Sequence, residues 1–65
     1  MHGRELVKND HYVLYEDGTE EFLKNGFTHR VDGPAVVLDN GDKFWYLHGI
    51  EMTKKQHRKE TKNRV

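Results

Sequence analysis

The stretch "DGTEEFLKNG" (residues 17–26) returns 23 positions later as "NGDKFWYLHG" (residues 40–49). The matches fall on glycines and on bulky apolar positions: Gly18 with Gly41, Phe22 with Trp45, Leu23 with Tyr46, and Gly26 with Gly49. Turn and core positions are the ones that a structural repeat must keep. The sequence therefore predicts two repeat units, residues 12–34 and 35–52, preceded by a degenerate half unit at residues 3–11.

Glycine dipeptides mark the turn of each predicted hairpin. Asp17-Gly18 and Asn40-Gly41 suit a two-residue turn, because both central residues of that turn need a positive φ. The strands that flank these turns are expected at residues 11–15, 20–24, 35–38 and 43–47. The sequence therefore predicts a mainly β fold over residues 1–52, an antiparallel meander of two tandem β-hairpin repeats.

The predicted hairpins leave apolar side chains on both faces of the sheet. Two-residue turns place Val13 opposite Phe22 and Val36 opposite Trp45, and β-branched residues pair favourably with aromatic ones. Neighbouring residues of a strand point to opposite faces, so the apolar run at residues 36–38 serves both faces. A lone sheet with two apolar faces needs a cover on the second face. A helix, a second protomer or a flat ligand could supply this cover, and we expect association as a homo-oligomer.

The composition excludes several kinds of chemistry. The 65 residues include no cysteine and no serine, so disulfides, thiolate metal sites and the cysteine and serine nucleophiles are absent. The five histidines lack the close spacing of metal ligands, and the paired acids flank a predicted hairpin turn. No apolar segment approaches membrane-spanning length. We expect a non-enzymatic protein without metal or cofactor and without a membrane partner.

The net charge of zero conceals a split along the chain. Residues 1–52 carry five Lys or Arg against ten Asp or Glu, whereas residues 53–65 carry six Lys or Arg against one Glu. Thr53 and Gln56 form a capping box, which predicts a short helix over residues 54–62. This helix is polar on all sides and has no apolar stripe with which to pack. We expect a basic helix and tail that is solvated or folds back on the acidic sheet; binding of nucleic acid is the less favoured alternative.

A basic pair stands directly before a tight-turn signal in the stretch "THRVDGPAVV" (residues 28–37). The guanidinium of Arg30 presents a rigid fork of donors that matches phosphate or carboxylate, and its plane stacks on aromatic rings. Aromatic rings on a sheet offer flat surfaces on which a base can stack. The candidate ligand-binding residues are His29, Arg30, Asp32, Trp45, Tyr46 and His48. A structural alternative stays open, in which Trp45 belongs to the core and Arg30 pairs with Asp32 to hold the turn.

Residues 17–49 follow the pattern D-G-x-x-x-F-x-x-N-G-x-x-H-R-x-D-G-P-A, then N-G and W-Y-x-x-G. With this pattern the segment resembles a small-protein repeat abundant in tailed bacteriophages, which is similar to the MORN-type repeat of bacterial hairpin arrays. The second unit departs from the pattern, because Met52-Thr53 stand in place of the His-Arg pair and His48 stands at the position of Asn25.

The resemblance implies a hairpin-repeat fold and a phage setting, with the protein in the cytoplasm of the infected bacterial host. Very small phage proteins commonly act on the host, many by blocking its defence systems. The function implied by analogy is a non-enzymatic binding module that counters host defence by sequestering a small nucleotide immune signal. Two alternatives accompany it: a protein–protein inhibitor of a host defence protein, and a purely structural repeat module.

Overall fold

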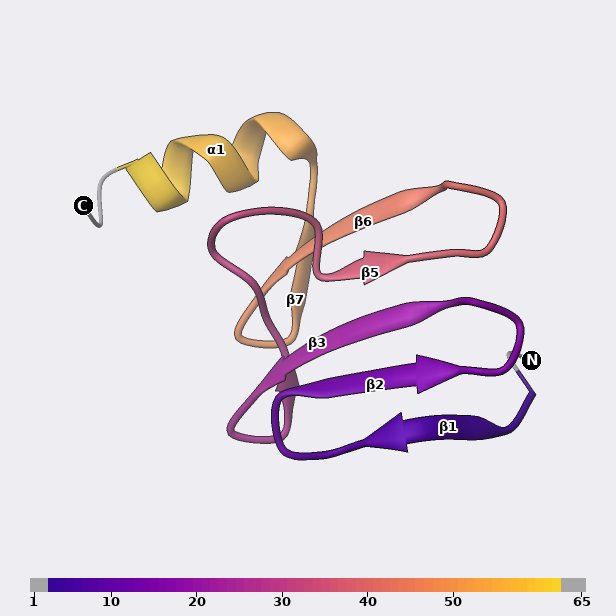
Figure 1. The fold of residues 1–65 in the computed structure, drawn as a ribbon. Helices are drawn as coiled ribbons and strands as arrows, with labels where there is room; N and C mark the ends of the chain where they lie inside the picture. The colour runs from indigo at the N-terminus through magenta and orange to yellow at the C-terminus, as the bar shows by residue number, and fades with distance from the viewer. Residues whose placement is uncertain (1–2, 63–65) are drawn as a thin grey trace.

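The computed structural model describes residues 3–62, so residues 1–2 of the predicted repeat domain and residues 63–65 of the predicted tail lie outside it. The described chain forms seven strands and one helix: β1 (Glu5–Lys8), β2 (Tyr12–Tyr15), β3 (Glu20–Lys24), β4 (Phe27–Thr28), β5 (Val36–Val37), β6 (Lys43–Leu47), β7 (Ile50–Met52) and α1 (Lys54–Lys62). The mainly β fold with a short C-terminal helix is confirmed (Figure 1).

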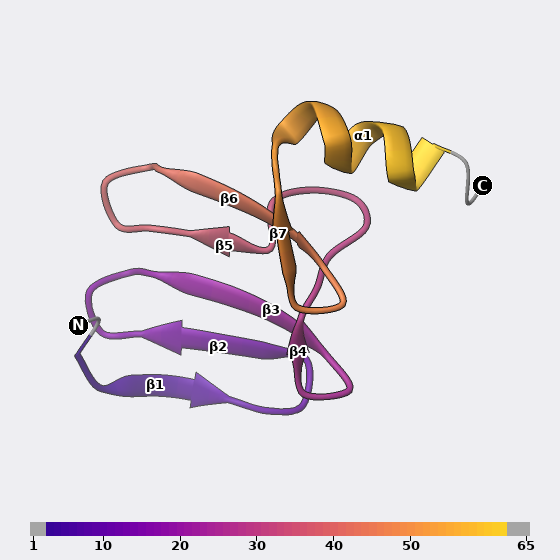
Figure 2. The same ribbon diagram turned by 180° about the vertical axis from the view of Figure 1, so that it is seen from behind.

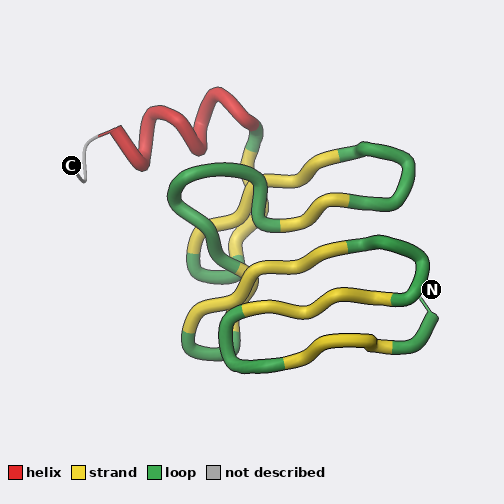
Figure 3. The backbone as a smooth tube through the Cα atoms, in the orientation of Figure 1, coloured by secondary structure: helices red, strands yellow, loops and turns green. Residues whose placement is uncertain are grey.

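The strands form one antiparallel sheet in the order β1-β2-β3-β5-β6-β7, with β4 paired to β3 outside this path. Strands β1, β2, β3, β5 and β6 lie side by side in one layer, and β4 and β7 cross behind one end of it (Figures 1 and 2). Short loops join the strands at both ends of the layer (Figure 3). The four predicted strands correspond to β2, β3, β5 and β6, whereas β1, β4 and β7 were not predicted. β4 and β7 are too short to show a period-two pattern.

The hairpin turns predicted at Asp17-Gly18 and Asn40-Gly41 have a different length. The Tyr15 N–H donates to the Thr19 carbonyl at 2.9 Å, which leaves a loop of three residues rather than two. Within that loop Gly18 has a φ of 93°, and Gly41 has a φ of 92° in the equivalent loop. A type I turn followed by a residue with positive φ makes the common three-residue hairpin loop. The prediction of two-residue turns at these dipeptides is therefore wrong.

The additional loop residue shifts the register of both hairpins by one position. The observed pairs are Val13 with Glu21 instead of Phe22, and Val36 with Phe44 instead of Trp45. A slip of one residue moves every side chain of the partner strand to the opposite face. Phe22 and Trp45 consequently lie on the face opposite to Val13 and Val36, which corrects the predicted cross-strand pairs. Each face still carries apolar side chains.

Two-residue turns do occur, at Asn25-Gly26 and His48-Gly49. Both residues of each turn have positive φ, 53° and 83° in the first and 53° and 82° in the second. These angles are those of type I′ turns, which match the twist of the flanking strands. The two turns are 23 residues apart, as are the two three-residue loops, which contain Gly18 and Gly41. The backbone therefore repeats with the same period as the sequence.

Few apolar side chains are fully enclosed. Among residues 3–62 the buried hydrophobic residues are Val13, Ala35 and Leu47, and the buried polar ones are Thr19, His29 and His57. A small apolar core contributes limited stability, so hydrogen bonds made by buried polar groups carry more weight in this fold. The expected homo-oligomer stays a prediction.

Helix α1 covers the predicted residues, and its capping box is formed. The Thr53 N–H donates to Gln56 Oε1, and the Gln56 N–H donates to Thr53 Oγ1, both at 3.1 Å. The helix packs beside β6. His57 is its one buried residue within the described chain, only 4% exposed, although the sequence showed no side chain with which to pack. Within residues 3–62 no helix has the length and apolar character that crossing a bilayer requires.

Candidate functional site

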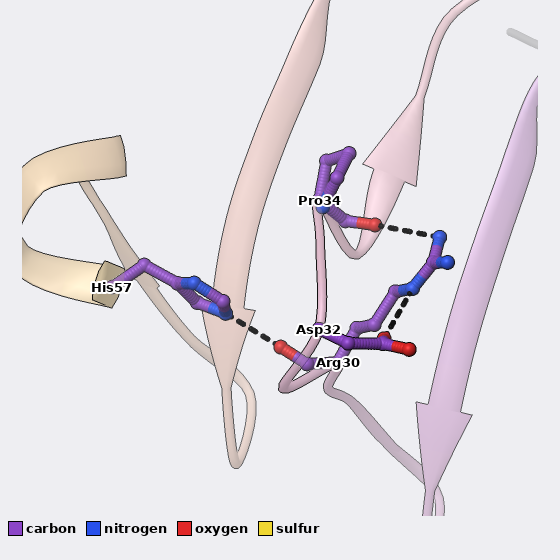
Figure 4. A network of polar contacts seen from close by, with 4 residues as sticks. All are labelled: Arg30, Asp32, Pro34 and His57. Atoms are coloured by element: carbon purple, nitrogen blue, oxygen red, sulfur yellow. Dashed lines mark hydrogen bonds and ion pairs between the residues drawn. The ribbon is translucent and has the colours of Figure 1, made fainter. Parts of the chain in front are cut away.

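Arg30 is held by the turn that follows it. Its Nε donates to Asp32 Oδ1 at 2.9 Å and its Nη1 donates to the Pro34 carbonyl at 3.4 Å (Figure 4). Its Cζ lies 4.1 Å from the centre of the Phe22 ring, a cation–π contact. A Cβ at Gly33 would lie 3.4 Å from Cζ, so the guanidinium also lies against the turn backbone. The geometry matches the structural alternative, in which Arg30 holds the turn.

The ion pair also acts on the acid of the turn. The hydrogen bond and the charge of the Arg30 guanidinium hold the pKa of Asp32 below its usual value. The Asp32 side chain is 82% exposed, so its second oxygen faces solvent while Arg30 is partly enclosed. Asp32 is thus ionised and accessible as an acceptor.

His29 joins the two repeat units. Its imidazole is 7% exposed, and its Nδ1 accepts from the backbone N–H of His48 at 2.9 Å. The two imidazole rings are 4.6 Å apart, and the His29 N–H donates to the Phe22 carbonyl. Because Nδ1 accepts a hydrogen bond, the neutral ring carries its proton on Nε2. His29 and His48, two of the candidate ligand-binding residues, therefore contact each other within the fold.

His57 is a buried residue with a structural role that the sequence did not reveal. Its Nε2 lies 2.5 Å from the backbone carbonyl of Arg30 (Figure 4). A carbonyl only accepts, so Nε2 carries the proton. The hydrogen bond joins α1 to the segment that contains His29 and Arg30. Arg30 lies 27 residues before His57 in the sequence. One signal was available: His57 is the least hydrophilic ionisable side chain in a helix of polar and charged residues.

Trp45 and Tyr46 point to opposite faces of β6, as neighbours in a strand do. The Trp45 ring faces α1, with Lys54 Nζ at 5.8 Å from its centre. Burial, and then the charges of Glu51 and Glu21, raise the pKa of Tyr46. A ligand that stacks on Trp45 does not reach Tyr46. The two aromatic residues predicted for one site therefore belong to different surfaces.

A shallow groove of about 260 Å³ runs between Trp45, α1 and the turn at residues 31–33. Asp32 lines it from the turn, and Lys54 and Arg58 line it from the helix. We call this the tryptophan groove. Of the six predicted site residues, only Asp32 and Trp45 line it. A second hollow of about 350 Å³ adjoins it, between Lys54, Lys55 and Arg58.

The helix turns its basic side chains outward. The described cations of α1 are Lys54, Lys55, Arg58, Lys59 and Lys62, and all are exposed. Within residues 3–62 no ion pair joins any of them to an acid. His57 takes up the inward position of the helix, so these charges are free to meet an anion from solvent.

No known protein family, curated protein or solved structure matches the chain. The resemblance to the phage repeat stays a prediction. The tryptophan groove offers a flat aromatic ring, two cations and one exposed carboxylate. This combination suits binding of an anion that carries a planar group.

Proposed function

We propose that this protein is a non-enzymatic binding module that captures a small nucleotide in the tryptophan groove. The observation that carries the proposal is the position of the Trp45 ring beside Lys54 and Arg58, two cations without an acidic partner among residues 3–62. Phosphate binds to the two cations, and the base stacks on the indole, a contact worth roughly 1–3 kcal/mol per base.

Asp32 gives the groove an acceptor for a neutral donor. Its charge is balanced by Arg30 at 2.9 Å, so it does not repel a nearby phosphate as strongly as an unpaired carboxylate would. The second carboxylate oxygen accepts from a ribose hydroxyl or from an amino group of the base. In this proposal Arg30, His29 and His48 serve the fold, and Tyr46 lies outside the ligand set.

The resemblance to phage repeats supplies the setting of the proposal. A phage protein of this size in the cytoplasm of an infected bacterium meets nucleotide signals of host immunity. Sequestering such a signal needs affinity and no catalytic group. The protein then counters host defence by lowering the free concentration of the messenger.

Calorimetry of the full chain with a panel of linear and cyclic nucleotides tests this function. We expect at least one nucleotide to bind with a Kd below about 100 μM, which corresponds to about −5.5 kcal/mol. The double variant Lys54→Ala/Arg58→Ala is expected to weaken that binding at least about tenfold, because two charge-assisted contacts are lost. Lys62→Ala removes the same charge from the same helix but away from the groove, and it is expected to change the Kd less than about twofold. Absence of binding across the panel, or equal losses in both variants, contradicts the proposal.

A protein–protein inhibitor is the second candidate, and two exposed apolar side chains favour it. Phe27 and Ile50 follow the two type I′ turns, and they are 59% and 65% exposed. A Cβ at Gly49 would lie 3.1 Å from the Phe27 ring, so that ring packs on the turn that precedes Ile50 and the two side chains share one edge. This function predicts that Phe27→Ser/Ile50→Ser abolishes capture of a host protein from bacterial lysate, whereas Lys54→Ala/Arg58→Ala does not. The reverse pattern contradicts it.

Self-association is also part of the proposal. The apolar side chains on both faces of the sheet support a homo-oligomer, because a lone sheet leaves one face without a cover. A purely structural module remains as the function if neither a nucleotide nor a host protein binds.

A further inference from the structure

The contact between the two repeat units has a defined chemistry. Three hydrogen bonds join residues 28–30 to the end of β6 and to the turn at His48-Gly49 that follows it. The Gly49 N–H donates to the Thr28 carbonyl at 2.8 Å, and the Arg30 N–H donates to the Tyr46 carbonyl at 3.2 Å. In the third bond, the His48 N–H donates to the imidazole Nδ1 of His29. The turn thus receives an extended segment that offers a carbonyl and an imidazole acceptor.

The same turn is present one repeat earlier, but no described segment occupies it. Asn25 and Gly26 have nearly the same φ values as the second turn. Within residues 3–62 neither of their backbone N–H groups has an acceptor. A groove of about 640 Å³ opens beside them, and its lining includes the apolar side chains of Val13, Tyr15 and Leu23 together with charged residues such as Glu21. The first unit therefore presents a vacant copy of the docking position that the second unit has filled.

Strand β1 explains why the first position is vacant. Leu6 stands 23 residues before His29, at the equivalent position of the repeat. Strand β1 pairs with β2 as the outer strand of the sheet, and Leu6 is 58% exposed where its equivalent is buried. The segment that corresponds to residues 28–30 thus forms the edge strand of the sheet and leaves the turn at Asn25 uncovered.

We propose that this groove docks an extended segment of another protein through the contact seen between the two units. The incoming segment offers a backbone carbonyl to the Gly26 N–H and the Nδ1 of a following histidine to the Asn25 N–H. Its histidine ring fills the groove over Val13 and Leu23. The partner is a chain with a Thr-His type segment held in extended conformation, as in a further repeat unit.

A second copy of this chain does not fit the position. Its segment at residues 28–30 is already bound within its own second unit. The next equivalent segment contains Met52-Thr53, which provides no imidazole. The partner is therefore a different chain. This inference uses residues outside the tryptophan groove and does not depend on nucleotide binding.

Titration of the full-length ¹⁵N-labelled protein with a synthetic peptide tests the inference by NMR. The peptide has the sequence "NGFTHRVDGPA" of residues 25–35 and is used up to about 1 mM, a concentration suited to weak binding. We expect the amide protons of Asn25 and Gly26 to move downfield, as amides do when they gain an acceptor. The amides of His48 and Gly49 are already bonded, so they serve as the internal control and are expected to stay unchanged.

Two altered peptides separate docking through histidine from general adhesion. With alanine in place of the histidine, the shifts at Asn25 and Gly26 are expected to fall at least about threefold. The alanine peptide offers no imidazole acceptor to the Asn25 N–H. With asparagine, whose Oδ1 replaces Nδ1, they are expected to persist. Absence of shifts at the first turn, equal shifts with the alanine peptide, or equal shifts at both turns overturns the proposal. Shifts of Asn25 and Gly26 that depend on protein concentration without peptide overturn it too, since the occupant is then a second copy.

Discussion

Replacing His29 with alanine is expected to lower the free energy of unfolding by about 2–4 kcal/mol. The substitution leaves the part-buried N–H of His48 without its acceptor, and loss of such a hydrogen bond costs about 1 kcal/mol or more. It also removes the ring that packs 4.6 Å from the His48 imidazole and leaves a cavity. Urea denaturation followed by Trp45 fluorescence measures the change. For a domain with a small apolar core this is a large part of the total stability.

Two variants make the test specific for the hydrogen bond. His29→Asn places Oδ1 near the position of Nδ1, so it is expected to recover a substantial part of the loss. His11→Ala changes an exposed imidazole and is expected to stay within about 0.5 kcal/mol of the wild type. If His29→Ala is no less stable than His11→Ala, the imidazole does not join the two units.

Replacing His57 with alanine is expected to release α1 from the sheet. The helix has nine residues, and His57 is the one buried residue among them. Isolated helices of that length are marginal in water. Once the bond to the Arg30 carbonyl is lost, the helix unwinds while the sheet keeps its pairing. We expect the helical circular dichroism signal at 222 nm to fall by more than about half, since α1 is the only helix among residues 3–62.

The controls for the helix use the geometry of the same bond. His57→Gln carries an amide N–H close to the position of Nε2 and is expected to retain most of the helical signal. Lys59→Ala changes an exposed side chain of the same helix, and alanine is the best helix former, so the signal is expected to stay or to rise. Retention of the full signal in His57→Ala contradicts the role assigned to the buried imidazole.

Turn chemistry made the repeat readable from sequence. Glycine is strongly favoured where φ is positive, and this preference is local to the residue. Gly18 and Gly41 therefore marked the hairpin loops, and Gly26 and Gly49 marked their period. The length of each loop was not readable, because an Asp-Gly or Asn-Gly pair occurs in loops of two and of three residues. The pairing of the flanking strands decides between them, and it shifted the register by one.

The helix shows the same division between local and distant causes. Its bounds followed from the capping box of Thr53 and Gln56, whose two hydrogen bonds lie within one turn. Its position did not follow, because the partner of His57 is a backbone carbonyl far along the chain. No pattern of side chains signals a free carbonyl at a distance.

The candidate site was predicted in part. The pairing of Arg30 with Asp32 followed from their spacing of two residues in an extended segment. The grouping of Trp45 with Lys54 and Arg58 did not follow from the sequence, because it depends on the position of α1 against β6 and on the bond from His57 to the distant Arg30 carbonyl. Tyr46 was grouped with Trp45 by sequence proximity, and the alternation of the strand separated them.

Residue types alone determined the period of 23, the strands β2, β3, β5 and β6, and the extent of α1, because φ preferences, apolar runs and capping bonds act over a few residues. Tertiary structure alone decided the register, the strands β1, β4 and β7, and the surface on which the helix lies. Each of these depends on hydrogen bonds between groups that are distant along the chain. Backbone N–H and C=O groups are the same in every residue except proline, so their pairing leaves little trace in the order of side chains.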